Sequence, residues 1–222
     1  MPLRTLAVAP HPDDEILGCG GTLLRRVAEG ATTAWLIVTH VSTDAGFSAE
    51  RVASRNAEIE RVAGMVGFHR VFRLDLPTMQ LDTMPRAELV RLISDVFREF
   101  EPEEVLLPNR TDAHSDHKIV FDAVSACTKW FRYPFVRRVM TYETVSETEF
   151  GLDPAHAFRP NYFVDIGPHL ERKLEIMSVY ASEVQAPPFP RSLEALRALA
   201  LLRGSTAGFA AAEAFELLRD RE

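Results

Sequence analysis

Two groups of histidine and carboxylate residues have the composition of a metal site. The first group is the run His11-Pro12-Asp13-Asp14-Glu15. The second group contains Asp112, His114, Asp116 and His117. Zinc binds imidazole nitrogen and carboxylate oxygen, and a catalytic zinc site keeps three protein ligands and one position open to water. These residue types therefore predict a metal-assisted reaction with water.

The spacing within the groups suggests which residues bind the metal and which accept a proton. His11 and Asp14 can converge from one loop, and His117 or His114 can supply a third ligand from the second group. Of two adjacent carboxylates, one can bind the metal while the other accepts a proton from the water. The alternative is structural, because acidic residues at 13–15 could cap a helix and favour its dipole. The histidines would then be ordinary loop and helix-start residues.

The apolar pattern shows which elements must position these groups. Apolar and β-branched runs predict strands at 3–9, 32–39, 71–74, 104–107, 136–142 and 162–166. Helical spacing predicts helices at 16–29, 49–66, 86–100, 117–127, 170–180 and 193–202. Segment 210–218 fits either a helix or a closing edge strand. The alternation up to about residue 128 predicts a Rossmann-like α/β fold, with a mainly parallel sheet and helices on both faces.

This fold places the two groups at the same edge of the sheet. The first predicted strand ends at Ala9, just before His11, and the fourth ends near Pro108, before the second group. Ligands of open α/β sheets bind beyond the carboxyl ends of the strands. The two groups together therefore predict one metal site. His40 ends a strand at the same edge and is a candidate for the pocket wall.

Composition excludes several classes of function. A net charge of −7 without a large Lys/Arg cluster argues against a nucleic-acid partner and against a membrane-surface protein. No apolar run approaches the ~20 residues of a membrane span, and the N-terminus does not have the pattern of a signal peptide. Cys19 and Cys127 form no CxxC pair and are expected to be free thiols in a reducing compartment. We therefore expect a cytoplasmic protein of a single domain, residues 1–222.

Three stretches resemble the LmbE-like/PIG-L deacetylases. The N-terminal signature is matched by Ala7-Val8-Ala9-Pro10-His11-Pro12-Asp13-Asp14-Glu15, followed by Gly18-Cys19-Gly20-Gly21-Thr22-Leu23. The second motif is matched by His114-Ser115-Asp116-His117, and a third landmark by Arg55-Asn56-Ala57-Glu58. The matches cover residues 3 to about 128, and beyond residue 150 the similarity is only general.

The resemblance implies a role for each matched residue. It implies that the zinc ligands are His11, Asp14 and His117 and that Asp13 is the general base. It implies that His114 is the acid or the oxyanion stabiliser and that Asp116 orients it. It also implies that Arg55 contacts the substrate. It also implies removal of an N-acetyl group from a glucosamine-type sugar or sugar conjugate, a small-molecule partner. Zn²⁺ is the expected cofactor, with Fe²⁺ as the alternative in the cell, and a homo-oligomer is compatible with the sequence.

The sequence departs from the family pattern at two places, and other readings stay open. Ser115 replaces a common proline, and Thr39-His40-Val41 replaces Thr-x-Gly in a segment that shapes the pocket, so the substrate is left open. A different small amide is one alternative, and a non-catalytic metal-binding or sugar-binding module is another. An Fe(II) oxygenase with a facial triad is disfavoured by the strand–helix alternation. Asp13 argues against a simple binding module, because binding alone does not require a carboxylate besides the metal ligands.

Overall fold

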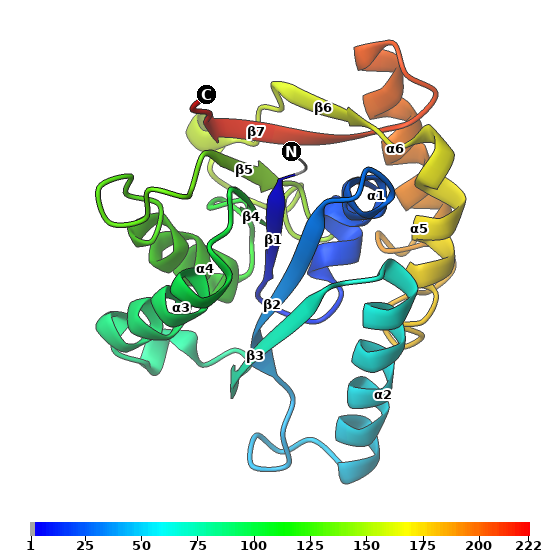
Figure 1. The fold of residues 1–222 in the computed structure, drawn as a ribbon. Helices are drawn as coiled ribbons and strands as arrows, with labels where there is room; N and C mark the ends of the chain where they lie inside the picture. Colours follow the sequence, from blue (N-terminus) through cyan, green and yellow to red (C-terminus); the bar gives the residue numbers. More distant parts are fainter. Residues whose placement is uncertain (1–2) are drawn as a thin grey trace.

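A seven-stranded sheet organises residues 3–222, which the computed structural model describes (Figure 1). The strand order is β3-β2-β1-β4-β5-β7-β6. The strands are β1 (Arg4–Ala9), β2 (Thr32–His40), β3 (Arg70–Pro77), β4 (Glu104–Pro108), β5 (Arg138–Tyr142), β6 (Tyr162–Asp165) and β7 (Ala212–Arg219). The first five strands are parallel, and β7 runs antiparallel to both β5 and β6. The predicted mainly parallel sheet is confirmed.

Helices cover both faces of the sheet. They are α1 (Asp14–Ala28), α2 (Ala49–Val66), α3 (Arg86–Phe100), α4 (Ser115–Ala126), α5 (Leu170–Met177) and α6 (Leu193–Ala207). Figure 1 shows α3 and α4 on one face and the other four helices on the opposite face. Short 3-10 turns lie at Leu81–Thr83, Pro154–His156 and Gly167–His169. None of the helices in residues 3–222 is long and apolar enough to cross a membrane.

Two hydrophobic cores lie on the two faces of the sheet. In β1, Leu6 and Val8 pack into the core under α3 and α4, and Ala7 and Ala9 pack into the core on the other face. Successive strand residues point to opposite faces. A strand that is covered on both faces must therefore be apolar throughout. This explains the uninterrupted apolar run that identified β1 in the sequence.

The position of the C-terminal segment in the sheet is the main difference from the expected arrangement. Segment 210–218 forms β7, and this strand lies between β5 and β6 instead of at an edge. Its position depends on hydrogen bonds to strands that lie far away in the sequence. Local periodicity does not carry that information. The edge strand on this side of the sheet is β6.

Helix α1 contains a break that a buried ion pair supports. Cys19 has non-helical angles, φ −142° and ψ 17°. The Gly21 N–H donates to Glu213 of β7 at 2.8 Å, and the Leu17 carbonyl accepts from Lys173 of α5 at 2.9 Å. In a regular helix this N–H would bond to this carbonyl. The buried Lys173–Glu213 pair, 2.6 Å apart, therefore replaces a helical hydrogen bond.

Close packing explains the glycines of α1. A Cβ atom on Gly18 would lie 2.1 Å from the Tyr142 ring, and one on Gly21 would lie 2.8 Å from Ile166. Neither position leaves room for a side chain. The glycine-rich run of α1 therefore serves close packing.

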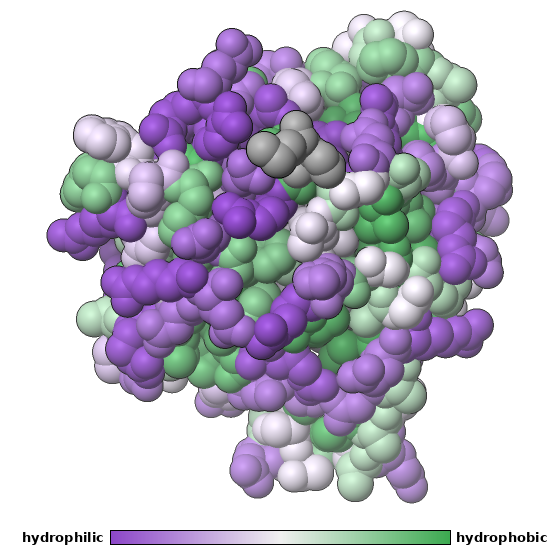
Figure 2. Space-filling model, viewed as in Figure 1, coloured by the Kyte–Doolittle hydropathy of each residue, from purple (hydrophilic) through white to green (hydrophobic). Residues whose placement is uncertain are grey.

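The face of the molecule drawn in Figure 2 is polar over much of its area, with local apolar areas. Figure 2 shows hydrophobic surface over the far end of α6. Leu201, Leu202 and Phe209 are exposed in this part of the chain.

Candidate metal and active site

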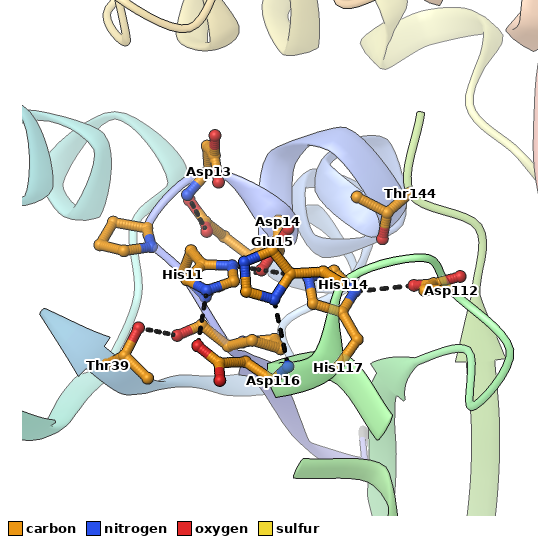
Figure 3. Close-up of polar contacts among 12 residues, drawn as sticks. His11, Asp13, Asp14, Glu15, Thr39, Asp112, His114, Asp116, His117 and Thr144 are labelled. Atoms are coloured by element: carbon orange, nitrogen blue, oxygen red, sulfur yellow. Dashed lines mark hydrogen bonds and ion pairs between the residues drawn. The ribbon is translucent and has the colours of Figure 1, made fainter. Parts of the chain in front are cut away.

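The two histidine–carboxylate groups meet at the carboxyl ends of β1 and β4, as predicted (Figure 3). His11 lies in the turn after β1, and Asp14 begins α1. His117 lies in the first turn of α4 and is 1% exposed. Parallel strands bring both turns to the same edge, and the loops then direct the side chains toward one another.

Three donor atoms converge at this edge. Asp14 Oδ2 lies 3.3 Å from His11 Nδ1 and 3.4 Å from His117 Nε2. The ligand atoms of the three residues all lie within 4.8 Å of one another. Two imidazoles and one carboxylate form a donor set suited to a divalent transition metal. The donors therefore fit the metal that the sequence predicts.

The ring nitrogen of His117 that faces away from Asp14 is held by a carboxylate. His117 Nδ1 lies 2.7 Å from Asp112 Oδ2. The other oxygen of Asp112 accepts from the Thr148 hydroxyl at 2.7 Å. Such a carboxylate fixes the ring orientation of a metal-binding histidine. The sequence places Asp112 in the second group but indicates no role for it, because its partner depends on side-chain direction.

His11 has the same kind of support from Asp116. Asp116 Oδ2 lies 3.2 Å from His11 Nε2 and also accepts the Met79 N–H at 2.8 Å. His114 and Asp116 form a second metal-compatible group with His11. In that group His114 is only half-buried, and its Nδ1 accepts a protein N–H group. In the set of His11, Asp14 and His117, both Asp14 and His117 are buried, although Asp14 Oδ2 also accepts the His11 N–H at 2.8 Å. This set is therefore the better candidate for a metal site.

The electrostatics of the three donors favour a bound cation. Burial lowers the pKa of His117, but Asp14 and Asp112 outweigh it and raise the value to about 10. Burial likewise lowers the pKa of His11, and hydrogen bonds to Asp116 and Asp14 raise it to about 9. Burial raises the pKa of Asp14, but the two histidines outweigh it and lower the pKa. Positive charge at the imidazoles is thus stabilised from several sides.

Asp13 is adjacent to Asp14 but has different contacts. It occupies the N-cap position of α1, yet its side chain makes no capping hydrogen bond. Its φ of 139° is unusual for a residue with a side chain. Its N–H donates to Glu15 at 3.1 Å, and its Oδ2 accepts from Arg191 at 3.3 Å. The capping interpretation of Asp13 is therefore wrong.

The environment of Asp13 favours proton transfer near neutral pH. Burial and the nearby carboxylates of Asp14 and Glu183 raise its pKa to about 7. A carboxyl group with such a pKa can accept and return a proton at neutral pH.

His114 lies over the same site. Its ring centroid is 4.4 Å from that of His11. His114 Nδ1 accepts the Asp116 backbone N–H at 3.1 Å, so the neutral ring carries its proton on Nε2. Burial and the charge of His11 lower the pKa of His114 to about 4. A neutral N–H donor is therefore available beside the donor set.

The carboxylate of Asp116 takes a different partner from the one that the resemblance implied. Within residues 3–222 its hydrogen bonds go to His11 and to Met79. Only the backbone N–H of Asp116 contacts His114. A local i,i+2 backbone contact thus orients His114, while the side chain reaches back to the turn after β1.

Arg55 is buried, with 4% exposure, so it is not a solvated helix residue. Its Nη1 donates to the Pro12 carbonyl at 2.7 Å, and its Nη2 pairs with Glu183. Its Nε lies 3.2 Å from Glu58, and the guanidinium lies over the Tyr180 ring. Arg55 therefore braces the turn that carries His11 and Asp13.

The C-terminal region supplies site residues that sequence reasoning missed. Glu183 and Arg191 reach the site from the proline-rich segment 182–191. Glu183 pairs with Arg51, Arg55 and Arg191, and Arg191 also pairs with Asp13. No motif or periodicity in this proline-rich stretch marks these residues, because their role depends on how the loop packs.

A cavity of about 260 Å³ opens beside the donor atoms. Its lining includes His11, Asp13, Asp14, His40, Arg55, Thr144, Glu147, His114, His117 and Arg191. His40 contributes to the wall, as the sequence suggested. The proposed donor set, the proposed base and the neutral His114 therefore face one space that can hold a small molecule.

Comparisons with known proteins give a family match and a relative in sequence. Residues 6–128 match the family model described as PIG-L, GlcNAc-PI de-N-acetylase. The chain is 28% identical over 225 residues to diacetylchitobiose deacetylase from Thermococcus kodakarensis, covering 95% of this chain and 81% of that protein.

Solved structures show the same fold. The conserved protein TT1542 from Thermus thermophilus has a TM-score of 0.80 and 28% identity, covering 99% of this chain and 96% of that chain. GalB, the 4-carboxy-2-hydroxymuconate hydratase from Pseudomonas putida, has a TM-score of 0.75 and 18% identity, covering 99% and 98%. GalB is a hydratase, so this fold alone does not define one reaction.

Proposed function

Since this chain belongs to the PIG-L family of GlcNAc-PI de-N-acetylases, we propose that it is a metal-dependent hydrolase that removes an N-acetyl group from an amino sugar or sugar conjugate. The observation that carries the proposal is the geometry of His11, Asp14 and His117 beside a separate carboxylate, Asp13. The diacetylchitobiose deacetylase relative supports an acetylated amino sugar as the substrate class.

Zn²⁺ is the proposed ion, with Fe²⁺ as the alternative in the cell, and His11, Asp14 and His117 would hold it. Two imidazoles and one carboxylate suit either metal. Such an ion, when bound, lowers the pKa of water and polarises a carbonyl group. Asp112 and Asp116 would keep the two imidazole rings in their binding orientation through the contacts described above.

The side chains of Asp13 and His114 would accept and donate protons in the reaction. Asp13, with its pKa near 7, would accept a proton from the attacking water and pass it toward the leaving amine. His114 would donate its Nε2–H to the developing oxyanion or protonate the amine nitrogen. These roles need Asp13 ionised and His114 neutral before the reaction. Both states are accessible near neutral pH.

Arg55 would act on the substrate through the N–H groups that its internal partners leave free. Its main contribution would be to hold the Pro12 carbonyl and Glu183. Arg55→Ala is expected to lower kcat/KM while metal content is retained. Unchanged kinetics on the true substrate would remove it from the site.

We further propose that residues 1–222 act as one catalytic domain in the cytoplasm. The single sheet takes strands from Arg4 to Arg219, which supports one domain. Cys19 and Cys127 are free and lie in different cores, in agreement with a reducing compartment.

The test is a screen of N-acetyl sugars, free and nucleotide-linked, for acetate release by the metal-loaded protein. We expect release that stops with a chelator and returns with Zn²⁺ or Fe²⁺. His117→Ala should abolish both metal binding and turnover, while the control His169→Ala, at a histidine outside the cavity, should do neither. Turnover only of acetylated amines without a sugar would favour a different amide. Sugar binding without acetate release would favour a binding module.

A further inference from the structure

One wall of the catalytic cavity carries polar side chains that have no protein partner. The turn after β5 brings Thr144, Ser146 and Glu147 to this wall. Thr144 Oγ1 and Ser146 Oγ are buried and make no hydrogen bond. A buried polar group without a partner destabilises the folded chain. The turn therefore carries hydroxyl groups whose hydrogen-bonding capacity the protein leaves unused.

The turn is held rigidly in place. The Glu147 and Thr148 N–H groups donate to the Thr144 carbonyl at 3.0 and 2.9 Å. Thr148 Oγ1 accepts the Thr144 N–H at 2.8 Å and donates to Asp112 at 2.7 Å. Asp112 in turn holds His117. The turn is thus fixed relative to the donor set, as a substrate subsite must be.

Glu147 is the carboxylate of this cavity that the protein does not use. Its backbone carbonyl accepts the Ala113 N–H at 3.0 Å, which anchors the residue. Its side chain is half-buried and has no ion pair or hydrogen bond to any residue between 3 and 222. On the other wall, by contrast, Glu183 and Asp13 are paired with arginines. Glu147 therefore presents a free acceptor to the cavity.

Thr144 adds a hydroxyl group on the same side. Figure 3 shows its oxygen directed toward the histidine cluster. A hydroxyl group both donates and accepts, and a carboxylate accepts strongly from O–H groups. Paired in this way, the two side chains match the O–H groups of a carbohydrate ring. A hydrocarbon would leave both unsatisfied, and an anionic group would be repelled by Glu147.

We propose that the turn 144–148 is the subsite that binds ring hydroxyl groups of the substrate, with Glu147 as the main acceptor and Thr144 as the second contact. This proposal rests on the proposed N-deacetylase function and specifies a neutral, polyhydroxylated sugar ring as the part of the substrate that binds at this turn. The subsite lies beside the donor set, so it positions the amide without taking part in bond making.

The test compares Glu147→Gln and Thr144→Val with the wild type on N-acetylglucosamine and on its monodeoxy analogues, each lacking one ring hydroxyl. Glu147→Gln should raise KM about 10–100-fold, and Thr144→Val about 3–10-fold, the ranges for a charged and a neutral hydrogen bond. Their kcat should change little, because the contact is equal in ground and transition states. At least one deoxy analogue should be hydrolysed almost equally by the wild type and by Glu147→Gln.

Matched controls keep the result interpretable. Thr33→Val removes another buried, unpartnered hydroxyl, which lies on β2 away from the cavity. Glu60→Gln neutralises an exposed carboxylate on α2. Both should keep the wild-type KM, and metal content will show that all variants are folded at the site. A KM within twofold of wild type in both test variants, or an equal loss on every deoxy analogue, would overturn the subsite. If the wild type releases no acetate from any sugar, the proposed function itself fails.

Discussion

Asp13 and Asp14 are adjacent residues of one type that lie in different electrostatic environments. The histidines around Asp14 lower its pKa, whereas burial and neighbouring carboxylates raise that of Asp13 to about 7. Environments that separate the pKa values of two acids also separate their roles. The positive φ of Asp13 keeps it out of the regular helix that Asp14 begins. Backbone strain at this position fits a functional constraint.

Replacing Asp13 by Asn tests the proposed base directly. Asn has the same shape and also tolerates a positive φ, so fold and metal content should be unchanged. It cannot accept a proton as a carboxylate does, and kcat should fall by about 10²–10⁴. Steady-state kinetics with metal analysis would measure both. Near-wild-type turnover at full metal occupancy would remove Asp13 from the mechanism.

Asp112 should matter to the metal and not to the proton transfer. Asp112→Ala removes the carboxylate that holds His117 Nδ1, and metal affinity should fall about 10–100-fold. Competition with a chelating dye would measure the affinity. Asp122→Ala, on the outer side of α4 beside Arg110, is the matched control and should bind metal normally. Equal affinity in the two variants would contradict the role of Asp112.

At the scale of elements, the buried Lys173–Glu213 pair connects the C-terminal region to the helix that carries Asp14. Glu213 accepts the N–H groups of Gly21 and Thr22, and Lys173 donates to the Leu17 carbonyl. The pair thus satisfies backbone groups on both sides of the break in α1. Removing one partner of such a pair leaves an uncompensated buried charge.

The two partners should contribute unequally to stability. Glu213→Leu leaves a buried lysine and two N–H groups without acceptors, so the free energy of unfolding should fall by about 3–5 kcal/mol. Lys173→Met should cost less, because the two N–H groups still stabilise the carboxylate. Urea unfolding monitored by circular dichroism would rank the variants. Equal losses in the free energy of unfolding, or a larger loss for Lys173→Met, would contradict the claim that Glu213 contributes more than Lys173 at the break in α1.

How far the sequence predicts these elements depends on the range of the contacts. The β1 and β4 loops could be placed because apolar runs and adjacent motifs are local signals. Spacing left His114 and His117 open as the third donor, and the choice of His117 came from the family resemblance. The partners of Asp116 and Asp112 depend on side-chain directions, which spacing leaves open. Glu183 and Arg191 depend on contacts across more than a hundred residues, as between Asp13 and Arg191. The interior position of β7 depends on pairing with β5 and β6, which also lie far from it in the sequence. Local patterns carry no information on such contacts.

For the whole molecule, the donor set lies where separate parts of the chain meet. His11 and Asp14 follow β1, His117 follows β4, and Arg191 closes the site from the C-terminal region. The two large apolar cores lie on either side of the sheet and contain none of the donor residues. The fold should therefore persist without a metal, while a bound metal should add stability by linking two loops.

Removing the metal tests whether the fold persists without it and whether a bound metal adds stability. A metal that binds only the folded state adds about 2.7 kcal/mol at a free concentration of one hundred times Kd. For a chain of this size, that corresponds to a rise in Tm of about 5–10 °C. The chelated protein should still unfold cooperatively, at the lower temperature. His117→Ala should show the lower Tm with and without Zn²⁺, whereas His169→Ala should respond as the wild type does. An unfolded chelated protein would show that the metal is part of the fold, and a Tm that is independent of Zn²⁺ in the wild type would contradict the proposed site.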